Sequence, residues 1–80
     1  MKVKITNKND TTDSYSLNLS KAFGVGRMAD TLIVYYSGSD ARFSFSSKKY
    51  KFEEVEMSAD GRAHYIKSSV EEIAERFLYD

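Results

Sequence analysis

The clearest pattern of hydrophobic and polar positions lies in the last part of the chain. Apolar side chains recur there at the spacing of one helical face, at Val70, Ile73, Ala74, Phe77 and Leu78. Ser68 and Ser69 each stand three residues before a glutamate, which matches the S-x-x-E capping box at a helix start. The pattern predicts an amphipathic helix from about residue 69 to 78, with Val70, Ile73 and Phe77 buried on a sheet.

A strand, a tight turn and a second strand are predicted before this helix. Segment 50–52 indicates a strand, Asp60-Gly61 suits a turn because Gly tolerates positive φ, and segment 62–67 returns as a strand. The aromatic residues at 50 and 52 have one phase of alternation, whereas Val55 and Met57 have the other. One extra residue reverses the face of every later side chain, so the pattern predicts a β-bulge near Glu53-Glu54.

Alternation also marks strands in the first half of the chain. Val3 and Ile5 alternate with polar residues, and a polar loop at 7–13 separates them from a second alternating run, formed by Tyr15, Leu17 and Leu19. Segment 31–37 is rich in β-branched and aromatic residues, which suits a central strand buried on both faces. Gly38-Ser39-Asp40 predicts a hairpin loop before a strand that carries Phe43 and Phe45.

The stretch from Ser20 to Asp30 has no clear periodicity. Ser20 suits the cap of a short helical turn, and Gly24 and Gly26 argue against a longer helix, so an irregular loop is the other prediction. Phe23 and Met28 are expected to anchor this stretch to the core. Residues 24–29 also spell G-x-G-x-x-A, but that fingerprint binds dinucleotides only after a buried parallel strand, so we interpret it as a flexible loop.

The order of these elements predicts a single α+β domain that spans residues 1–80. Consecutive hairpins give an antiparallel β-sheet of about five or six strands, and the C-terminal helix packs on one face of it. The chain has no Cys, so no disulfide supports so small a core. Five Phe and six Tyr are therefore expected to supply most of the packing.

The composition argues against catalysis, cofactors and metals. His64 is the sole imidazole, and without Cys or a second His it has no evident partner for metal binding or general-base chemistry. The first five residues alternate charged and apolar side chains, unlike a secretory signal, and the longest apolar run, 32–36, is too short to span a bilayer. We expect a cytoplasmic, non-enzymatic protein with no membrane contact.

Charge is uneven along a chain whose net charge is zero. Residues 1–50 carry +4 and residues 51–80 carry −4, which fits either strands and helix that attract each other or an acidic surface for a partner. The preferred hypothesis is a small protein-binding module that contacts a larger protein or complex. Its expected partner-binding residues are Glu53, Glu54, Glu56 and Asp60, with Tyr50 and Tyr65 as aromatic anchors. A phage or mobile-element accessory protein that inhibits a host macromolecule would fit this class.

Two further hypotheses stay open. The segment 42–52 interleaves basic and aromatic residues, as single-stranded nucleic-acid binders do, and its candidate phosphate contacts are Arg42, Lys48, Lys49 and Lys51. The neutral net charge weighs against this alternative, because dedicated nucleic-acid binders are usually basic. The third hypothesis is a small enzyme or ligand binder built around His64 and the 24–29 stretch.

Overall fold

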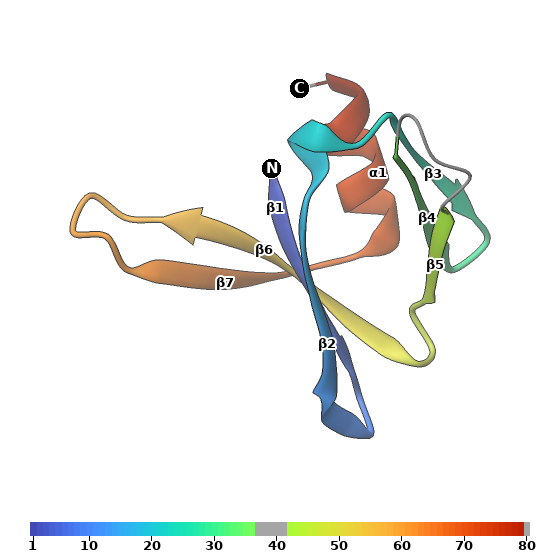
Figure 1. Ribbon diagram of the computed structural model, residues 1–80, viewed down its shortest axis with the longest axis horizontal. Helices are drawn as coiled ribbons and strands as arrows, with labels where there is room; N and C mark the ends of the chain where they lie inside the picture. The colour runs from blue at the N-terminus through green and yellow to red at the C-terminus, as the bar shows by residue number, and fades with distance from the viewer. Residues whose placement is uncertain (37–41, 80) are drawn as a thin grey trace.

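The computed structural model describes residues 1–36 and 42–79, so the predicted loop at Gly38-Ser39-Asp40 lies outside the described residues. The elements follow one another as β1 (Lys2–Asn7), β2 (Asp10–Asn18), the 3₁₀ turn η1 (Leu19–Lys21), β3 (Gly24–Met28), β4 (Thr31–Tyr35), β5 (Arg42–Ser46), β6 (Tyr50–Met57), β7 (Ala63–Ser68) and α1 (Val70–Tyr79) (Figure 1). The predicted α+β class, antiparallel and with a C-terminal helix, is confirmed. The strands form two sheets where one was predicted.

Four strands form the larger sheet, here called sheet A, in the order β2-β1-β6-β7. Val3 and Ile5 of the central strand β1 lie opposite Leu17 and Tyr15 of β2. Because side chains alternate across a strand, all residues in register with Val3 and Ile5 share one face. We call this the inner face, since Val3 and Ile5 are fully buried there, and we call the opposite side the outer face.

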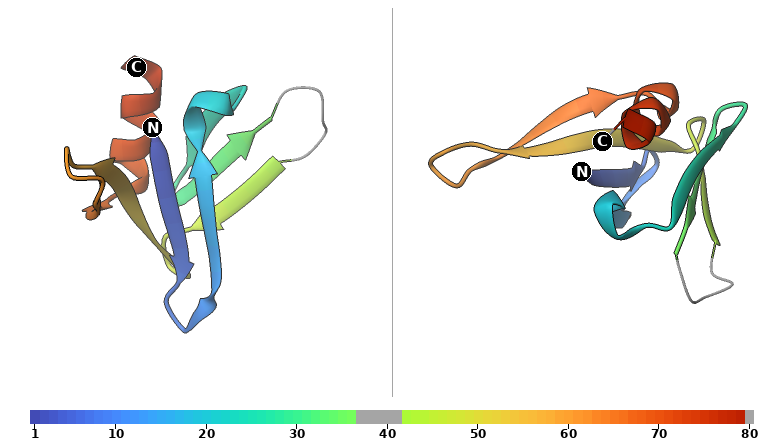
Figure 2. Two further views of the ribbon diagram at one scale, coloured as in Figure 1. Left: turned by 60° about the vertical axis from the view of Figure 1, so that its left-hand side comes forward. Right: turned by 90° about the horizontal axis from the view of Figure 1, so that it is seen from above.

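The smaller sheet, sheet B, has the order β3-β4-β5 and completes the core. Leu32 and Val34 of its central strand β4 are buried together with Phe45 of β5, and they join the inner face of sheet A in one hydrophobic cluster. Strand β4 is the central strand of its sheet, as predicted. The prediction that it is buried on both faces is wrong, because Tyr35 is exposed. Seen from above, α1 lies between the end of β7 and β3 (Figure 2), and its contacts with sheet B are to β3 and β4.

The helix begins as the sequence predicts. The Ser69 hydroxyl accepts a hydrogen bond from the Glu72 amide at 3.1 Å, and a Glu72 carboxylate oxygen lies 3.4 Å from the Ser69 amide, which together form the capping box. Val70 and Ile73 are buried in the core. Phe77 is only half-buried against it, so the expectation that Phe77 is a main core residue was too strong.

The stretch after η1 was predicted wrongly. Residues 24–28 form strand β3 and pair with β4 in continuous register, despite the two glycines. Phe23 and Met28, the expected core anchors, are both exposed. The 3₁₀ turn is present, but its cap is Asn18, whose side-chain oxygen accepts a hydrogen bond from the Ser20 amide at 3.2 Å.

The connection between β1 and β2 is shorter than the predicted wide loop. Strand β2 already begins at Asp10, and the Asn7 side-chain oxygen accepts a hydrogen bond from the Asn9 amide at 2.9 Å, which fixes the turn. The register shifts between Thr6 and Asn7.

Candidate functional site

Strand β6 contains no bulge, and this settles where its three glutamates lie. Its pairing with β1 and with β7 runs in unbroken register, so Glu54 lies on the inner face beside Phe52. Glu54 is only 6% exposed. Glu54 occupies an inward position where the alternation of Tyr50 and Phe52 would lead one to expect an apolar residue, while the apolar Val55 and Met57 face outward. The alternation therefore reverses in the sequence although the strand is regular, and the predicted bulge at Glu53-Glu54 is wrong.

Side chains from β7 and α1 compensate the buried carboxylate. Oε2 of Glu54 accepts a hydrogen bond from the Ser68 hydroxyl at 2.6 Å, and the same oxygen pairs with the Arg76 guanidinium. A buried charge is tolerated only when it is paired and hydrogen-bonded. Glu54 therefore holds β6, β7 and α1 together. The expectation that it belongs to an exposed acidic surface is wrong, because its side chain is buried.

The other three acids of the expected partner site are separated from one another. Glu53 lies on the outer face, directly between Lys4 and Lys67 in the register and 3.9 Å from Lys51. Glu56 follows on the opposite face, where β6 has passed the end of β1. Asp60 belongs to the turn. Thus no continuous acidic surface forms along β6.

The turn between β6 and β7 uses the residues that predicted it. Gly61 has a φ of 82°, and its amide donates to the Ser58 carbonyl at 3.0 Å. The Asp60 carboxylate accepts hydrogen bonds from the Ser58 hydroxyl and from the Arg62 amide. These bonds favour the ionised form, so the pKa of Asp60 is lowered, mainly by Ser58.

Beyond β1, strands β6 and β7 continue as a two-stranded arm. The last β6 residue that pairs with β1 is Val55, so residues 56–64 form a hairpin without a third strand; we call this segment the arm (Figure 1). Met57 on the arm is 61% exposed, and Tyr65 at its base is 51% exposed. Exposed aromatic and Met side chains are enriched at protein interfaces.

Next to the exposed apolar side chains of the arm, the outer face of sheet A carries mainly basic residues. Across the regularly paired strands, the register places on this face Lys2, Lys4, Lys51, Glu53, Val55, Met57, Tyr65 and Lys67. The Lys4 ammonium lies 5.2 Å from the centre of the Tyr65 ring, a cation–π contact. Four lysines against one glutamate give this face a positive balance. Strand alternation in the sequence carried this signal, but the pairing of the three strands β1, β6 and β7 was needed to find it.

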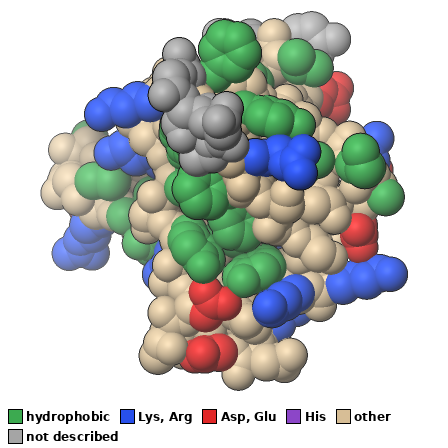
Figure 3. Space-filling view, turned by 45° about the vertical axis from the view of Figure 1, so that its right-hand side comes forward, with side chains coloured by type: hydrophobic (Ala, Val, Ile, Leu, Met, Phe, Trp, Pro, Cys, Tyr) green, Lys and Arg blue, Asp and Glu red, His purple; other side chains and the backbone are tan. Residues whose placement is uncertain are grey.

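Tyr50, one of the two expected anchors, lies on the inner face in a cluster of rings. It packs edge-on against Phe45 with ring centres 5.4 Å apart, and Tyr15 lies 6.3 Å away. Its hydroxyl donates to the Asp13 carboxylate at 2.9 Å, and the Asn7 amide group donates to the same oxygen at 3.1 Å. Figure 3 shows a group of hydrophobic side chains on one face of the molecule, with acidic side chains below it.

These bonds shift the ionisation of the cluster. The Asn7 amide and then the Tyr50 hydroxyl lower the pKa of Asp13, because both donate to its ionised form. The same carboxylate raises the pKa of both Tyr15 and Tyr50, because it accepts hydrogen bonds from their neutral hydroxyls and repels a phenolate. Tyr50 is thus tied to the framework, whereas Tyr65 is the more exposed of the two expected anchors.

The residues of the nucleic-acid alternative do not share one surface. Arg42 begins β5 in sheet B, Lys48 and Lys49 lie in the connection to β6, and Lys51 lies on the outer face of sheet A, where Glu53 is its partner. Among the rings next to them, Phe45 and Phe52 are buried, whereas Phe43 beside Arg42 is 41% exposed. Stacking of bases needs open rings beside the cations.

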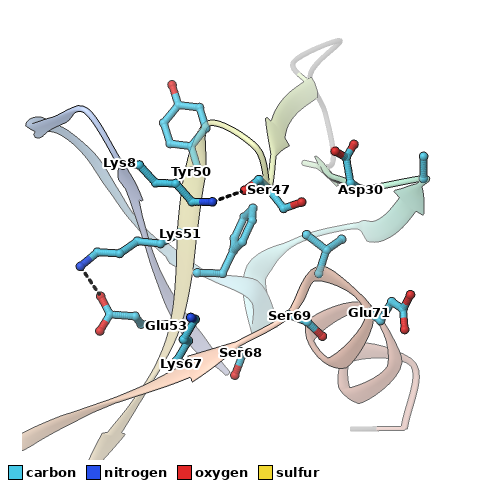
Figure 4. A pocket seen from close by; sticks show the side chains of 13 residues that line it. Lys8, Asp30, Ser47, Tyr50, Lys51, Glu53, Lys67, Ser68, Ser69 and Glu71 are labelled. Carbon is cyan, nitrogen blue, oxygen red and sulfur yellow. Dashed lines mark hydrogen bonds and ion pairs between the residues drawn. The ribbon is translucent and has the colours of Figure 1, made fainter.

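A cleft of about 770 Å³ opens beside the start of α1. Figure 4 shows its lining, in which the Lys8 ammonium donates to the Ser47 carbonyl at 2.7 Å and Lys51 pairs with Glu53. Three lysines and three acids line the cleft, so neither charge dominates. The apolar part of the lining includes Phe52 and Val70.

The residues of the enzyme hypothesis lie apart. His64 belongs to the arm, whereas the 24–28 segment is strand β3 of the other sheet, and Figures 1 and 2 show β3 at the far side of the molecule from the arm. Among residues 1–36 and 42–79, no three His, Asp or Glu side chains are grouped so that they could hold a metal ion. Over the same ranges, no helix has the length and apolar character needed to cross a membrane.

Comparisons of the chain with protein-family models, with curated proteins and with solved structures found no match. The site is therefore judged from its own chemistry. The outer face of sheet A and the arm combine exposed apolar side chains with unbalanced positive charge.

Proposed function

We propose that this protein is a non-catalytic binding module that contacts another protein through the outer face of sheet A and the arm. The observation that carries the proposal is the exposure of Met57 and Tyr65 on one continuous face, with lysines around them. A solvent-exposed surface that places large apolar side chains next to charged ones is typical of sites that bind other proteins. Tyr65 is suited to the role of anchor, because its ring gives apolar area and its hydroxyl can still bond a partner.

The proposal differs from the acidic surface expected from the sequence. Glu54 holds the core, and Glu53 is surrounded by lysines, so charge on this face attracts acidic rather than basic partners. The wider role of a cytoplasmic accessory protein, of the kind a phage or mobile element uses to inhibit a host macromolecule, belongs to the same proposal. It is supported by small size and by the lack of a chemical motif.

The test is capture of a partner from a cell lysate, with and without nuclease, by wild type and by two matched double variants. Met57→Ser with Tyr65→Ser alters the proposed face. The control, Met28→Ser with Tyr35→Ser, removes exposed apolar side chains from sheet B. We expect the first variant to lose the partner and the control to retain it, because interface energy concentrates in a few anchors.

The outcomes separate the hypotheses. Retention of the partner by the Met57 and Tyr65 variant would show that this face is not the interface. Loss of all captured material on nuclease treatment would favour the nucleic-acid alternative and contradict the proposal. Circular dichroism of each variant shows whether the fold is intact before capture is compared.

A further inference from the structure

Strand β7 is an edge strand of sheet A, and its protection is limited to one charged side chain, Lys67. Natural edge strands are protected by bulges, Pro, charged side chains such as Lys, or a covering element. The pairing of β7 with β6 is regular from Ala63 to Ser68, without a bulge, and residues 63–67 are all exposed. The opposite edge, β2, has a register shift near its start and carries Ser14, Ser16 and Asn18 on the outer face.

The side chains of β7 define what a further strand would meet. On the outer face, Tyr65 and Lys67 stand at the margin of the sheet, whereas Ile66, 43% exposed, points to the other face. A strand added beside β7 would present its own side chains alternately to these two surfaces. A strand with acidic side chains toward the outer face, beside Lys67, and apolar side chains toward the inner face, beside Ile66, would complement both surfaces.

The charge of the outer face identifies the partner chemistry. Lys2, Lys4 and Lys67 have no carboxylate within ion-pair distance among the described residues, and Lys51 has Glu53 at 3.9 Å. A second copy of this chain would bring the same lysines to the edge, so like charges would oppose pairing. Single-stranded nucleic acid would find one ring on this face, Tyr65, already in contact with Lys4.

We infer that β7 accepts an extended, acidic segment of a partner protein as a fifth strand of sheet A. The inference rests on the proposed function and specifies how the partner binds. Main-chain hydrogen bonds along β7 supply the affinity of such strand addition, and alternate side chains supply its specificity. Glutamates or aspartates of the segment lie beside Lys67 and Lys4, and its apolar residues lie beside Ile66.

The test uses the whole protein, labelled with ¹⁵N, and three probes. The first probe is a short peptide of alternating glutamate and valine, the second replaces glutamate with lysine, and the third is an oligothymidine strand. We expect the first peptide to shift the backbone amide signals of residues 63–68. The lysine peptide should bind roughly tenfold more weakly or worse, because its charges meet those of the outer face.

Charge variants sharpen the test. Lys4→Gln combined with Lys67→Gln should weaken the glutamate peptide several-fold, whereas the control Lys48→Gln, in the β5–β6 connection, should leave its affinity unchanged. Equal binding of both peptides, shifts that avoid residues 63–68, or binding of oligothymidine alone would overturn the inference. Shifts of the same amides with protein concentration, in the absence of peptide, would show that a second copy takes this edge.

The two proposals fail in different ways. If capture from lysate depends on Met57 and Tyr65 but no peptide perturbs the β7 amides, protein binding stands and strand addition is wrong. If the glutamate peptide binds at β7 but the Met57 and Tyr65 variant captures its partner normally, the edge accepts acidic strands and the proposed interface is wrong.

Discussion

The two faces of sheet A are made by the same four strands and differ in burial and charge. On the inner face, Val3 and Ile5 are fully buried. The acid Glu54 is buried there too, and its carboxylate accepts a hydrogen bond from the Ser68 hydroxyl. On the outer face, Tyr65, Lys2, Lys51 and Lys67 are exposed and Lys4 is half-buried, and the side-chain contacts there include Lys4 with Tyr65 and Lys51 with Glu53. Neighbouring residues in β6 therefore differ in their surroundings: Glu54 is bonded within the fold, and Glu53 lies on the face that we propose binds a partner.

The largest effect on stability is expected from substitutions in α1 that remove side chains packed in the core. Ile73→Ala should lower the free energy of unfolding by about 2–5 kcal/mol, because it removes a fully buried side chain from the core. Phe77→Ala should cost less, since Phe77 is half-buried. Urea denaturation of both variants measures the difference, and an equal loss would mean that α1 is oriented differently.

Next in size is a comparison of the two adjacent glutamates. Glu54→Ala should lower the free energy of unfolding by about 1.5–3 kcal/mol, since Ser68 and Arg76 lose a charged partner. Because Arg76 is half-exposed, water compensates part of that loss. Glu53→Ala should change stability by under about 0.5 kcal/mol. Similar effects of the two substitutions would contradict the assignment of Glu53 and Glu54 to opposite faces.

A smaller effect, dependent on pH, is expected at the bond between Tyr50 and Asp13. Tyr50→Phe should lower the melting temperature at neutral pH, because it removes the hydrogen bond to the carboxylate. The lowered pKa of Asp13 means that this stabilisation is present above the ordinary Asp value of about 3.9 and is lost as the pH falls through the lower folded value. The raised pKa of Tyr50 means that it is also lost in alkali, as the pH rises through the folded tyrosine value.

Thermal melts of wild type and Tyr50→Phe across the pH range provide the measurement. The difference between their melting temperatures should be greatest between these limits and should narrow at both extremes. A difference that does not vary with pH would show that the hydroxyl acts through packing alone. Tyr36→Phe serves as the control, because Tyr36 also packs against a phenylalanine, Phe43, in an edge-on contact.

The smallest effect on stability is expected on the outer face. Lys67→Gln should change the free energy of unfolding by less than about 0.5 kcal/mol, as is usual for exposed side chains. We expect the same substitution to weaken binding of the glutamate peptide, so stability and binding should be affected separately on this face. A loss of stability comparable to that of Glu54→Ala would mean that the outer face is part of the fold.

Local patterns were sufficient to predict the helix, the β6–β7 turn and the fold class. The capping serines with their glutamates and Asp60-Gly61 act over a few residues, so their signals are complete in the sequence. Strand β3 was missed because Gly24 and Gly26 weaken local strand preference, and pairing with β4 overrides it. The error at Glu54 has a similar origin, since its partners Ser68 and Arg76 are remote in sequence.

The candidate site was only partly predicted for the same reason. Tyr65 was identified from its residue type, and Lys51 was noted for a different hypothesis. Lys2, Lys4 and Lys67 meet only through pairing between β1, β6 and β7, which sequence periodicity does not specify. Periodicity shows which residues share a face within a strand, and the register shows which strands bring them together.

The central position of β1 has a consequence for synthesis of the chain. Its partner on one side, β2, follows within a few residues, but the other side is completed by β6, and α1 is made later still. Val3 and Ile5 therefore stay in contact with water, or with chaperones, while most of the chain emerges from the ribosome. Folding that depends on such distant contacts is slower than folding from local ones. We expect sheet A to assemble only after β6 and β7 have been translated.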